Sequence, residues 1–155
     1  MQLNKAVFIN LDGTLVKTKS GNDHFINTDD WEFNSGILPV LKRYTNEGYY
    51  ICIVSNQGGI STGKVLESDV EERIRKIDKE LEQYLGCGVN SAYAKQLESY
   101  YRKPNPGMAY HFALELHLSL RDSIMIGSTK TDNDFAKNAY IGTYYHVNDF
   151  INSNI

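Results

Sequence analysis

The sequence has little cysteine and no long apolar run. Its two cysteines, Cys52 and Cys87, are too few for a four-ligand zinc site, and no CxxC or CxH cluster accompanies them. No stretch approaches the roughly 20 apolar residues of a membrane span, and the apolar run near the N-terminus is too short for the core of a signal peptide. These absences predict a soluble, cytoplasmic protein without zinc and without a membrane partner.

An excess of positive charge is also missing. The 155 residues carry 16 Lys and Arg against 19 Asp and Glu, a formal net charge of −3. Overall basicity therefore does not indicate a nucleic-acid binder, although a local basic groove remains possible. The hydrophobic content of 41% is ordinary for a globular chain, which excludes disordered, fibrous and repeat classes. The length predicts one domain spanning residues 1–155.

Apolar runs alternate with segments of helical period along most of the chain. Strands are predicted at 5–10, 49–55, 90–94, 123–127 and 142–147, and helices at 36–46, 68–85, 105–117 and 132–139. This alternation predicts an α/β fold with a Rossmann-like, doubly wound, largely parallel sheet. The charged face of the second helix, from Glu71 to Glu82, is typical of a solvated surface.

The polar segment 16–36 has no helical period and is predicted to form a small flap after the first strand, with no large cap domain. Trp31 within it either anchors the flap or stacks on a base. Lys17, Lys19, Lys64 and Arg102 form either a basic rim for a nucleic-acid end or solvated surface charges.

Polar residues follow the predicted strands where each strand ends, and in doubly wound sheets this edge holds the active crevice. A phosphate needs charge neutralisation and positioned donors, which Lys103, Ser55 and the backbone amides of the turn at 12–14 can supply. The predicted catalytic residues are Asn10, Asp12, Ser55, Lys103 and Asp132, and the predicted phosphate-binding residues are Gly13, Thr14, Asn56, Gln57, Arg102 and Lys103.

These segments resemble the four motifs of the haloacid dehalogenase-like (HAD) phosphatases. N-L-D-G-T at 10–14 resembles the aspartate loop D-x-D-G-T, Ser55 and Lys103 match the second and third motifs, and G-S-x-x-x-D at 127–132 matches the fourth imperfectly. S-N-Q-G-G-I-S-T-G-K at 55–64 and Y-R-K-P-N-P-G-M at 101–108 are similar to the 3′-phosphatase domain of polynucleotide kinase-phosphatases. The resemblance implies a DNA 3′-phosphatase scaffold.

Two related groups differ from this chain. Histidinol- and heptose-phosphate phosphatases usually carry a cysteine-rich zinc loop, which the sequence lacks, and we therefore expect the chain to stand apart from them. The chain also has no G-x-x-x-x-G-K-[ST] motif, so no kinase half is expected.

The sequence departs from the family pattern at two positions. The resemblance places Asn10 where the family has the aspartate that attacks phosphorus, and Ser128 where the family has an aspartate that binds Mg²⁺. A carboxamide is a poor nucleophile. Mg²⁺ prefers anionic oxygen ligands, so Asn10, Ser128 and the Asp12 carbonyl predict weak binding at best. No metal ligand and no cofactor are therefore predicted, with Mg²⁺ expected only if the site is active.

Three explanations of this departure stay open: loss of turnover, an Asp-to-Asn exchange in an active enzyme, or an activity that bypasses Asn10 through Asp12 or Asp132. We expect the first, a catalytically degenerate 3′-phosphatase homologue that keeps a phosphate pocket or serves as a structural or partner-binding module. The alternative is an active Mg²⁺-dependent DNA 3′-phosphatase. The expected partners are 3′-phosphorylated DNA or RNA ends, or a protein.

Overall fold

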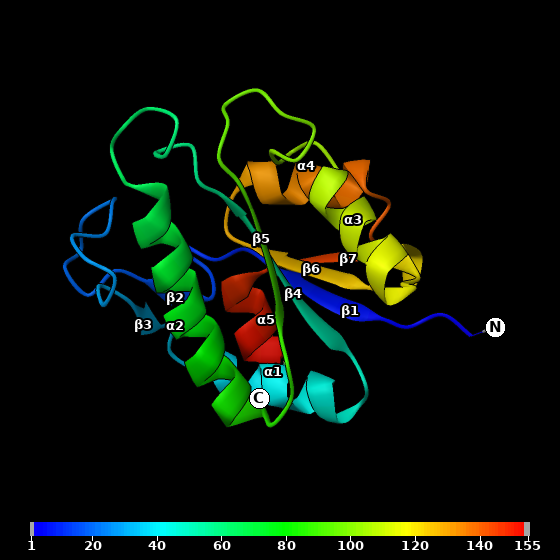
Figure 1. The fold of residues 1–155 in the computed structure, drawn as a ribbon. Coiled ribbons are helices and arrows are strands. Elements are labelled where there is room, and N and C mark those ends of the chain that lie inside the picture. The colour runs from blue at the N-terminus through cyan, green and yellow to red at the C-terminus, as the bar shows by residue number, and fades with distance from the viewer. Residues whose placement is uncertain (1, 154–155) are drawn as a thin grey trace.

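The computed structural model describes residues 2–153. Five strands form one parallel sheet in the order β5-β4-β1-β6-β7 (Figure 1). They are β1 (Ala6–Ile9), β4 (Tyr50–Asn56), β5 (Asn90–Ala94), β6 (Ile124–Gly127) and β7 (Thr143–His146). The predicted α/β, Rossmann-like fold is confirmed. Each predicted strand is present, β5 with the predicted bounds and the other four with ends shifted by one residue.

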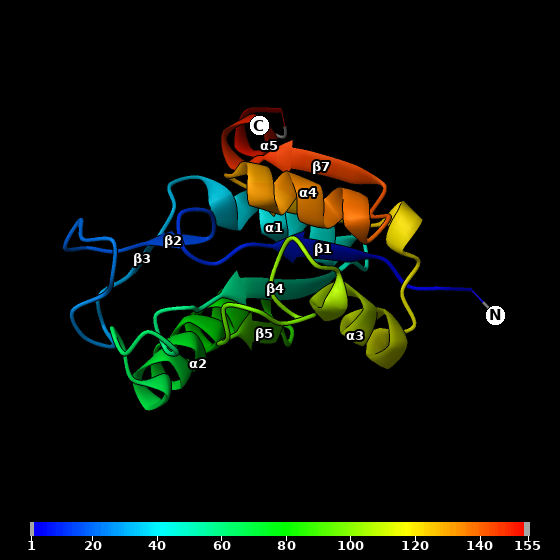
Figure 2. The same cartoon turned by 90° about the horizontal axis from the view of Figure 1, so that it is seen from above.

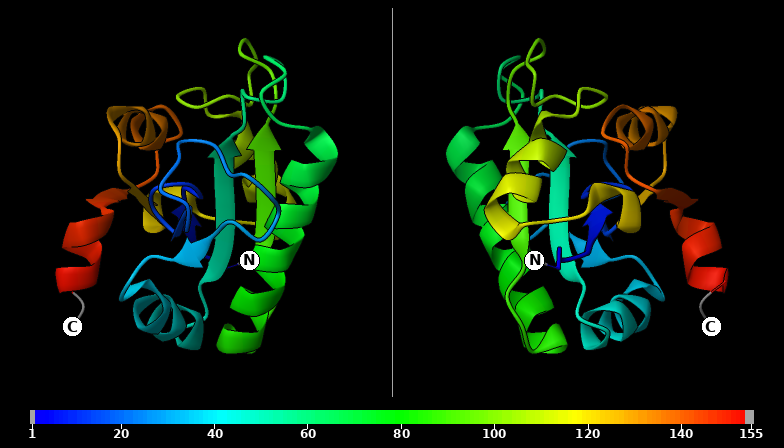
Figure 3. Two further views of the ribbon diagram at one scale, coloured as in Figure 1. Left: turned by 90° about the vertical axis from the view of Figure 1, so that its left-hand side faces the viewer. Right: turned by 90° about the vertical axis from the view of Figure 1, so that its right-hand side faces the viewer.

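Helices cover both faces of the sheet. They are α1 (Ile37–Asn46), α2 (Glu67–Leu85), α3 (Gly107–Leu116), α4 (Lys130–Asn138) and α5 (Val147–Ser153), with a short 3₁₀ turn η1 (Leu120–Asp122) before β6. The apolar faces of α1, α2 and α5 pack on one side, and those of α3 and α4 pack on the other (Figures 2 and 3). Parallel strands of this kind are buried on both faces, which explains their nearly continuous apolar sequences.

Strand β1 lies at the centre of the sheet and shows how the two layers are built. Side chains alternate along a strand. Val7 and Ile9 therefore enter the core beneath α1, α2 and α5, whereas Ala6 and Phe8 enter the core beneath α3 and α4. All four are fully buried. Because both faces of β1 are buried, the strand is held rigidly in place, and Asn10 and Asp12 follow directly at its carboxyl end.

The flap at 16–36 contains a two-stranded antiparallel sheet, β2 (Val16–Lys17) and β3 (Glu32–Phe33). The Asp30 carboxylate fixes the loop between these strands by accepting hydrogen bonds from the Ser20 amide, the Ser20 hydroxyl and the Ile26 amide. Trp31 is 8% exposed and packs edge-on against Phe33, so it anchors the flap. Between residues 2 and 153 there is no large cap domain, and no helix there is long and apolar enough to cross a membrane.

Helix α5 was not expected from the sequence. It is only seven residues long, and Val147 and Phe150 are its buried positions. Val147, Phe150 and Ile151 have helical spacing, but seven residues are too few to establish a period, and the helix forms because these side chains complete the core beside α1.

Candidate active site

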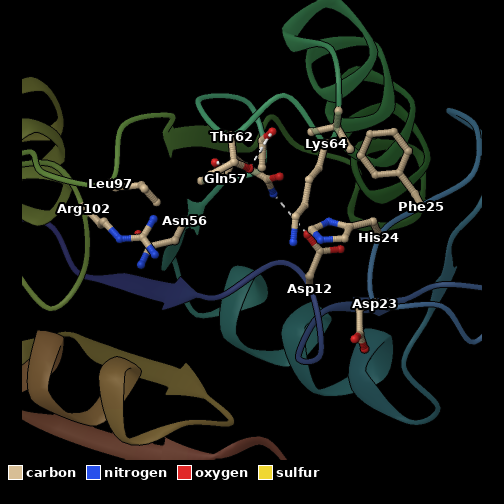
Figure 4. Close-up of a pocket in the computed structure, with 13 residues that line it drawn as sticks. Asp12, Asp23, His24, Phe25, Asn56, Gln57, Thr62, Lys64, Leu97 and Arg102 are labelled. Carbon is tan, nitrogen blue, oxygen red and sulfur yellow. Dashed lines mark hydrogen bonds between the residues drawn. The ribbon is translucent and has the colours of Figure 1, made fainter.

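A cavity of about 360 Å³ opens where the loops after β1, β4 and β5 meet the flap (Figure 4). The loops after β4 and β5 rise together at this end of the sheet (Figures 1 and 3). A volume of a few hundred Å³ is typical of small-molecule sites. The side chains that bear on its chemistry are Asp12, His24, Phe25, Gln57, Lys64 and Arg102.

Asp12 is the acidic side chain of the β1 loop that reaches this cavity. Its carboxylate accepts hydrogen bonds from Arg73 Nη1 at 2.9 Å and Gln57 Nε2 at 3.1 Å. Its side chain is nevertheless 46% exposed. Gly13 follows with φ of 84°, a left-handed conformation that favours glycine and turns the chain back below the cavity. Asp12 is thus an oriented carboxylate that faces solvent and any bound ligand.

Lys103 lies behind the cavity rather than in it. Its side chain is 2% exposed, and Nζ donates to Asn10 Oδ1 at 2.7 Å, Asp132 Oδ1 at 2.8 Å and the Val54 carbonyl at 2.9 Å. Burial lowers the pKa of Lys103, and the Asp132 carboxylate opposes that shift. Since an ammonium has three protons, this arrangement leaves Lys103 none to donate to a phosphate.

Asn10 is engaged at both ends of its carboxamide. Oδ1 accepts from Lys103, while Nδ2 donates to the Asp12 carbonyl at 2.8 Å and to Thr14 Oγ1 at 3.3 Å. Thr14 Oγ1 donates in turn to Ser128 Oγ at 3.1 Å. Asn10 and Ser128, the two positions where the sequence departs from the family pattern, are therefore joined by one hydrogen-bond network through Thr14.

The same network tests whether Mg²⁺ fits. The groups that would face the ion are Asn10, the Asp12 carbonyl and Ser128, all neutral, and the Asp12 carbonyl already accepts from Asn10. The Asp132 carboxylate is 2% exposed and bonded to Lys103 and to the Ser128 amide. Within residues 2–153, no cluster of three or more His, Cys, Asp or Glu could hold a metal. Because Mg²⁺ is usually held by one or two carboxylates, this donor set does not fit it.

The loops carrying Asn56 and Lys103 are tied together by a reciprocal pair. Asn56 Nδ2 donates to the Lys103 carbonyl at 3.0 Å, and the Lys103 amide donates to Asn56 Oδ1 at 2.9 Å. This pair sets the direction of the neighbouring Arg102, whose guanidinium lines the cavity. Arg102 Nη1 is buried without a hydrogen-bond partner.

The structure brings some predicted site residues to the cavity and keeps others inside. Asp12, Asn56, Gln57 and Arg102 line it. Thr14, Ser55, Lys103 and Asp132 are each at most 3% exposed and support the loops from beneath. Of the predicted basic rim, Lys64 and Arg102 reach the cavity, whereas Lys17 pairs with Glu32 on the flap and Lys19 borders a different hollow.

Arg73 is a residue of the site that was not predicted from the sequence. The charged face of α2 was expected to be solvated, yet Arg73 is 1% exposed and holds Asp12. A signal was present, because Arg73 falls three residues after Val70 and four before Ile77, both buried. That spacing places Arg73 on the apolar face of the helix.

The curated proteins similar to this chain include phosphatases. A D-glycero-beta-D-manno-heptose-1,7-bisphosphate 7-phosphatase of Helicobacter pylori is 30% identical over 136 residues, 85% of this chain and 77% of that protein. The enzyme of the same name from Escherichia coli K12 is 28% identical over 150 residues, 89% of this chain and 76% of that protein. The D,D-heptose 1,7-bisphosphate phosphatase of B. bronchiseptica, solved with magnesium and phosphate, superimposes with a TM-score of 0.77 at 22% identity, covering 90% of this chain and 78% of that one.

These relatives correct three expectations. The prediction of a degenerate, non-catalytic protein is wrong, because the curated relatives, which match most of this chain, are named as phosphatases. The prediction of DNA 3′-phosphatase activity is also contradicted, since the substrate in the names of these relatives is a sugar bisphosphate. The physical reason lies in Asp12, an exposed carboxylate that remains although Asn10 is neutral. The expectation that the chain stands apart from heptose phosphatases was wrong as well, because such an enzyme is 30% identical over 85% of this chain, although this chain has no cysteine-rich zinc loop.

Family membership follows from a match that spans most of the fold. The sequence model described as polynucleotide kinase 3 phosphatase matches residues 5–131, from the start of β1 into α4. The matched stretch contains β1, β4, β5 and β6 and the loops that build the cavity. The chain therefore belongs to the polynucleotide kinase 3 phosphatase family.

Proposed function

We propose that the protein is a phosphomonoester hydrolase acting on a small phosphorylated sugar. One observation carries this proposal: an exposed carboxylate, Asp12, shares a cavity of about 360 Å³ with two cations, Lys64 and Arg102. The cations come from different loops, so they can contact a ligand from two sides. The kinship with sugar bisphosphate phosphatases supports the same substrate class.

The cations favour a substrate with more than one anionic group. Within residues 2–153, neither Lys64 nor Arg102 has a carboxylate within ion-pair distance. Arg102 Nη1 is also buried without a hydrogen-bond acceptor, which is costly for a charged donor. Phosphoryl oxygens would satisfy both side chains, and arginine binds phosphate in a bidentate manner. A sugar bisphosphate provides an acceptor for each.

The size and walls of the cavity favour a small molecule. The flap closes one side with His24 and Phe25, and Leu97 borders the other (Figure 4). A volume of about 360 Å³ lies in the range that encloses a small ligand. Gln57 Nε2 already donates to Asp12 and to Ser55 Oγ, and Gln57 Oε1 can accept a hydrogen bond from a sugar hydroxyl.

The reaction we assign to this geometry uses Asp12 as a general base. Its carboxylate takes a proton from a water molecule while the water oxygen forms a bond to phosphorus. The ester P–O bond breaks, and the leaving alkoxide takes the proton back from Asp12, giving an alcohol and inorganic phosphate. Arg73 and Gln57 hold the carboxylate, and Lys64 and Arg102 neutralise charge on the phosphoryl oxygens. No step passes through Mg²⁺, because the donor set does not fit that ion.

The test is release of inorganic phosphate from a panel: a heptose 1,7-bisphosphate, the corresponding monophosphates and a 3′-phosphorylated oligonucleotide, each with Mg²⁺ and with EDTA. We expect the bisphosphate to have the highest kcat/KM. Asp12→Asn should lower kcat by about 10²–10⁴-fold, the usual contribution of a positioned acid–base group. Asp149→Asn, an exposed carboxylate on α5, is the matched control. No release from any sugar phosphate, or full activity of Asp12→Asn, overturns the proposal.

A further inference from the structure

Arg73 is a charged side chain enclosed by the protein. It is 1% exposed, and its guanidinium lies 4.9 Å from the centre of the Phe25 ring. Nη1 donates to Asp12 Oδ1 at 2.9 Å, while Nε and Nη2 donate to the Asp30 carbonyl at 3.4 and 3.3 Å. Buried charges are retained only where partners surround them. The partners of this one belong to two separate segments, the β1 loop and the flap.

The flap side of this contact is itself well ordered. Asp30 holds the loop at 20–30 through its three hydrogen bonds. The hydrogen bond from the Ser20 hydroxyl contributes most to lowering the pKa of Asp30, which falls to about 2. Helix α2 contacts the flap at a second point, where Lys76 Nζ donates hydrogen bonds to Asp29 Oδ1 and to Thr28 Oγ1, both at 2.7 Å. The flap therefore docks on α2 as a folded unit, with Arg73 at its inner end.

We propose that Arg73 is a positioning residue that couples docking of the flap to the orientation of Asp12. When the flap is docked, the Asp30 carbonyl and the Phe25 ring fix the guanidinium, which then fixes the Asp12 carboxylate. When the flap lifts, the guanidinium loses these partners and exchanges them for water, and Asp12 loses its fixed direction. The coupling is reciprocal, because the same guanidinium bridges both groups. The catalytic half of this inference rests on the proposed role of Asp12.

Steady-state kinetics on the full chain test the catalytic half. We compare Arg73→Met with Arg75→Met, whose arginine is on the same helix but 69% exposed and paired with Glu72. Arg73→Met should lower kcat at least tenfold and change KM by less than threefold, because Asp12 is misplaced while Lys64 and Arg102 still bind the substrate. Arg75→Met should leave both unchanged. Equal kcat values for the two variants overturn the positioning role.

Docking of the flap can be measured by fluorescence, without any enzymatic activity. Trp31 is the single tryptophan of the chain and follows Asp30 directly. Quenching of its fluorescence by acrylamide should rise at least twofold in Arg73→Met and also rise in Asp12→Asn, but not in Arg75→Met. Arg73→Lys, which keeps the charge and cannot form the same forked contacts, covers the case in which the methionine variant does not fold. If wild type releases no phosphate, the proposed function fails, and the quenching comparison still decides the coupling. Unchanged quenching in Arg73→Lys and Asp12→Asn overturns it.

Discussion

The ammonium nitrogen of Lys103 lies 2.8 Å from Asp132 Oδ1, and both side chains are 2% exposed. The pair joins the loop before α3 to the first turn of α4, across the carboxyl end of the sheet. Since Lys103 also donates to Asn10 and to the Val54 carbonyl, the pair fixes the floor on which the cavity rests. Its role here is to hold structure, which leads to the first prediction.

Lys103→Met should destabilise the fold severely. Removal of one partner leaves the Asp132 carboxylate buried without its counter-charge, which costs about 3–5 kcal/mol of unfolding free energy. Urea denaturation measures the loss. Lys130→Met is the control, because Lys130 is 88% exposed and its pair with Asp134 contributes at most about 1 kcal/mol. A loss for Lys103→Met no larger than for Lys130→Met would contradict the structural role.

Gly127→Ala should also disturb this floor. A Cβ added to Gly127 would lie 2.3 Å from Asp132 Cβ, so α4 or β6 must move. We expect a loss of about 1–3 kcal/mol, the usual cost of overpacking, together with lower kcat as the loop at 128 shifts. Gly88→Ala is the matched control, since its nearest atom is the flexible end of Glu82 at 3.5 Å. Thermal unfolding compares the two, and equal melting temperatures would count against the crowding at Gly127.

The strands and the loop positions of the site could be predicted from the sequence because each depends on a local pattern. The apolar runs at 5–10 and 49–55 are long enough to show burial on both faces, and polar residues after parallel strands must meet at one edge. Asp12, Gln57 and Arg102 reach the cavity as a consequence.

The roles of individual side chains could not be predicted in the same way. Lys103 was expected to bind phosphate, but which partners a lysine meets depends on the register of β1, β4 and α4 together, and these use all three of its protons. Arg73 pairs with Asp12 across 61 residues of sequence, and neither residue's neighbours indicate the other. Pairings of that kind are decided by tertiary packing.

A double substitution, Asn10→Asp with Ser128→Asp, should create a magnesium site. Two carboxylates would then face the Asp12 carbonyl, and Mg²⁺ would offset their mutual repulsion. At about 100 times its Kd, the ion adds about 2.7 kcal/mol of stability. Thermal unfolding with Mg²⁺ or with EDTA should therefore show a rise of several degrees for the double variant and almost none for wild type. The same rise in wild type would show that the neutral donor set does bind Mg²⁺.

Asp78, on the side of α2 that contacts β5, should make stability depend on pH. Its carboxylate accepts from Ser91 Oγ at 2.8 and 2.9 Å, and burial raises its pKa to about 6. The folded protein then holds a proton that the unfolded chain has released, so the unfolding free energy falls as pH rises from about 4 to about 6. Allowing for partial solvent screening, we expect a fall of about 1–2 kcal/mol from this group.

Asp78→Asn should remove that fall, because an amide does not titrate and keeps one acceptor for Ser91. The variant should match wild type near pH 4 and exceed its unfolding free energy by about 1–2 kcal/mol at pH 7. Urea denaturation across this pH range measures both. Glu80→Gln, an exposed carboxylate on the same helix, should keep the wild-type pH dependence. The prediction fails if the plots of unfolding free energy against pH are parallel for Asp78→Asn and wild type. Parallel plots would mean that the carboxyl of Asp78 titrates alike in the folded and unfolded chain, so burial does not favour its protonated form.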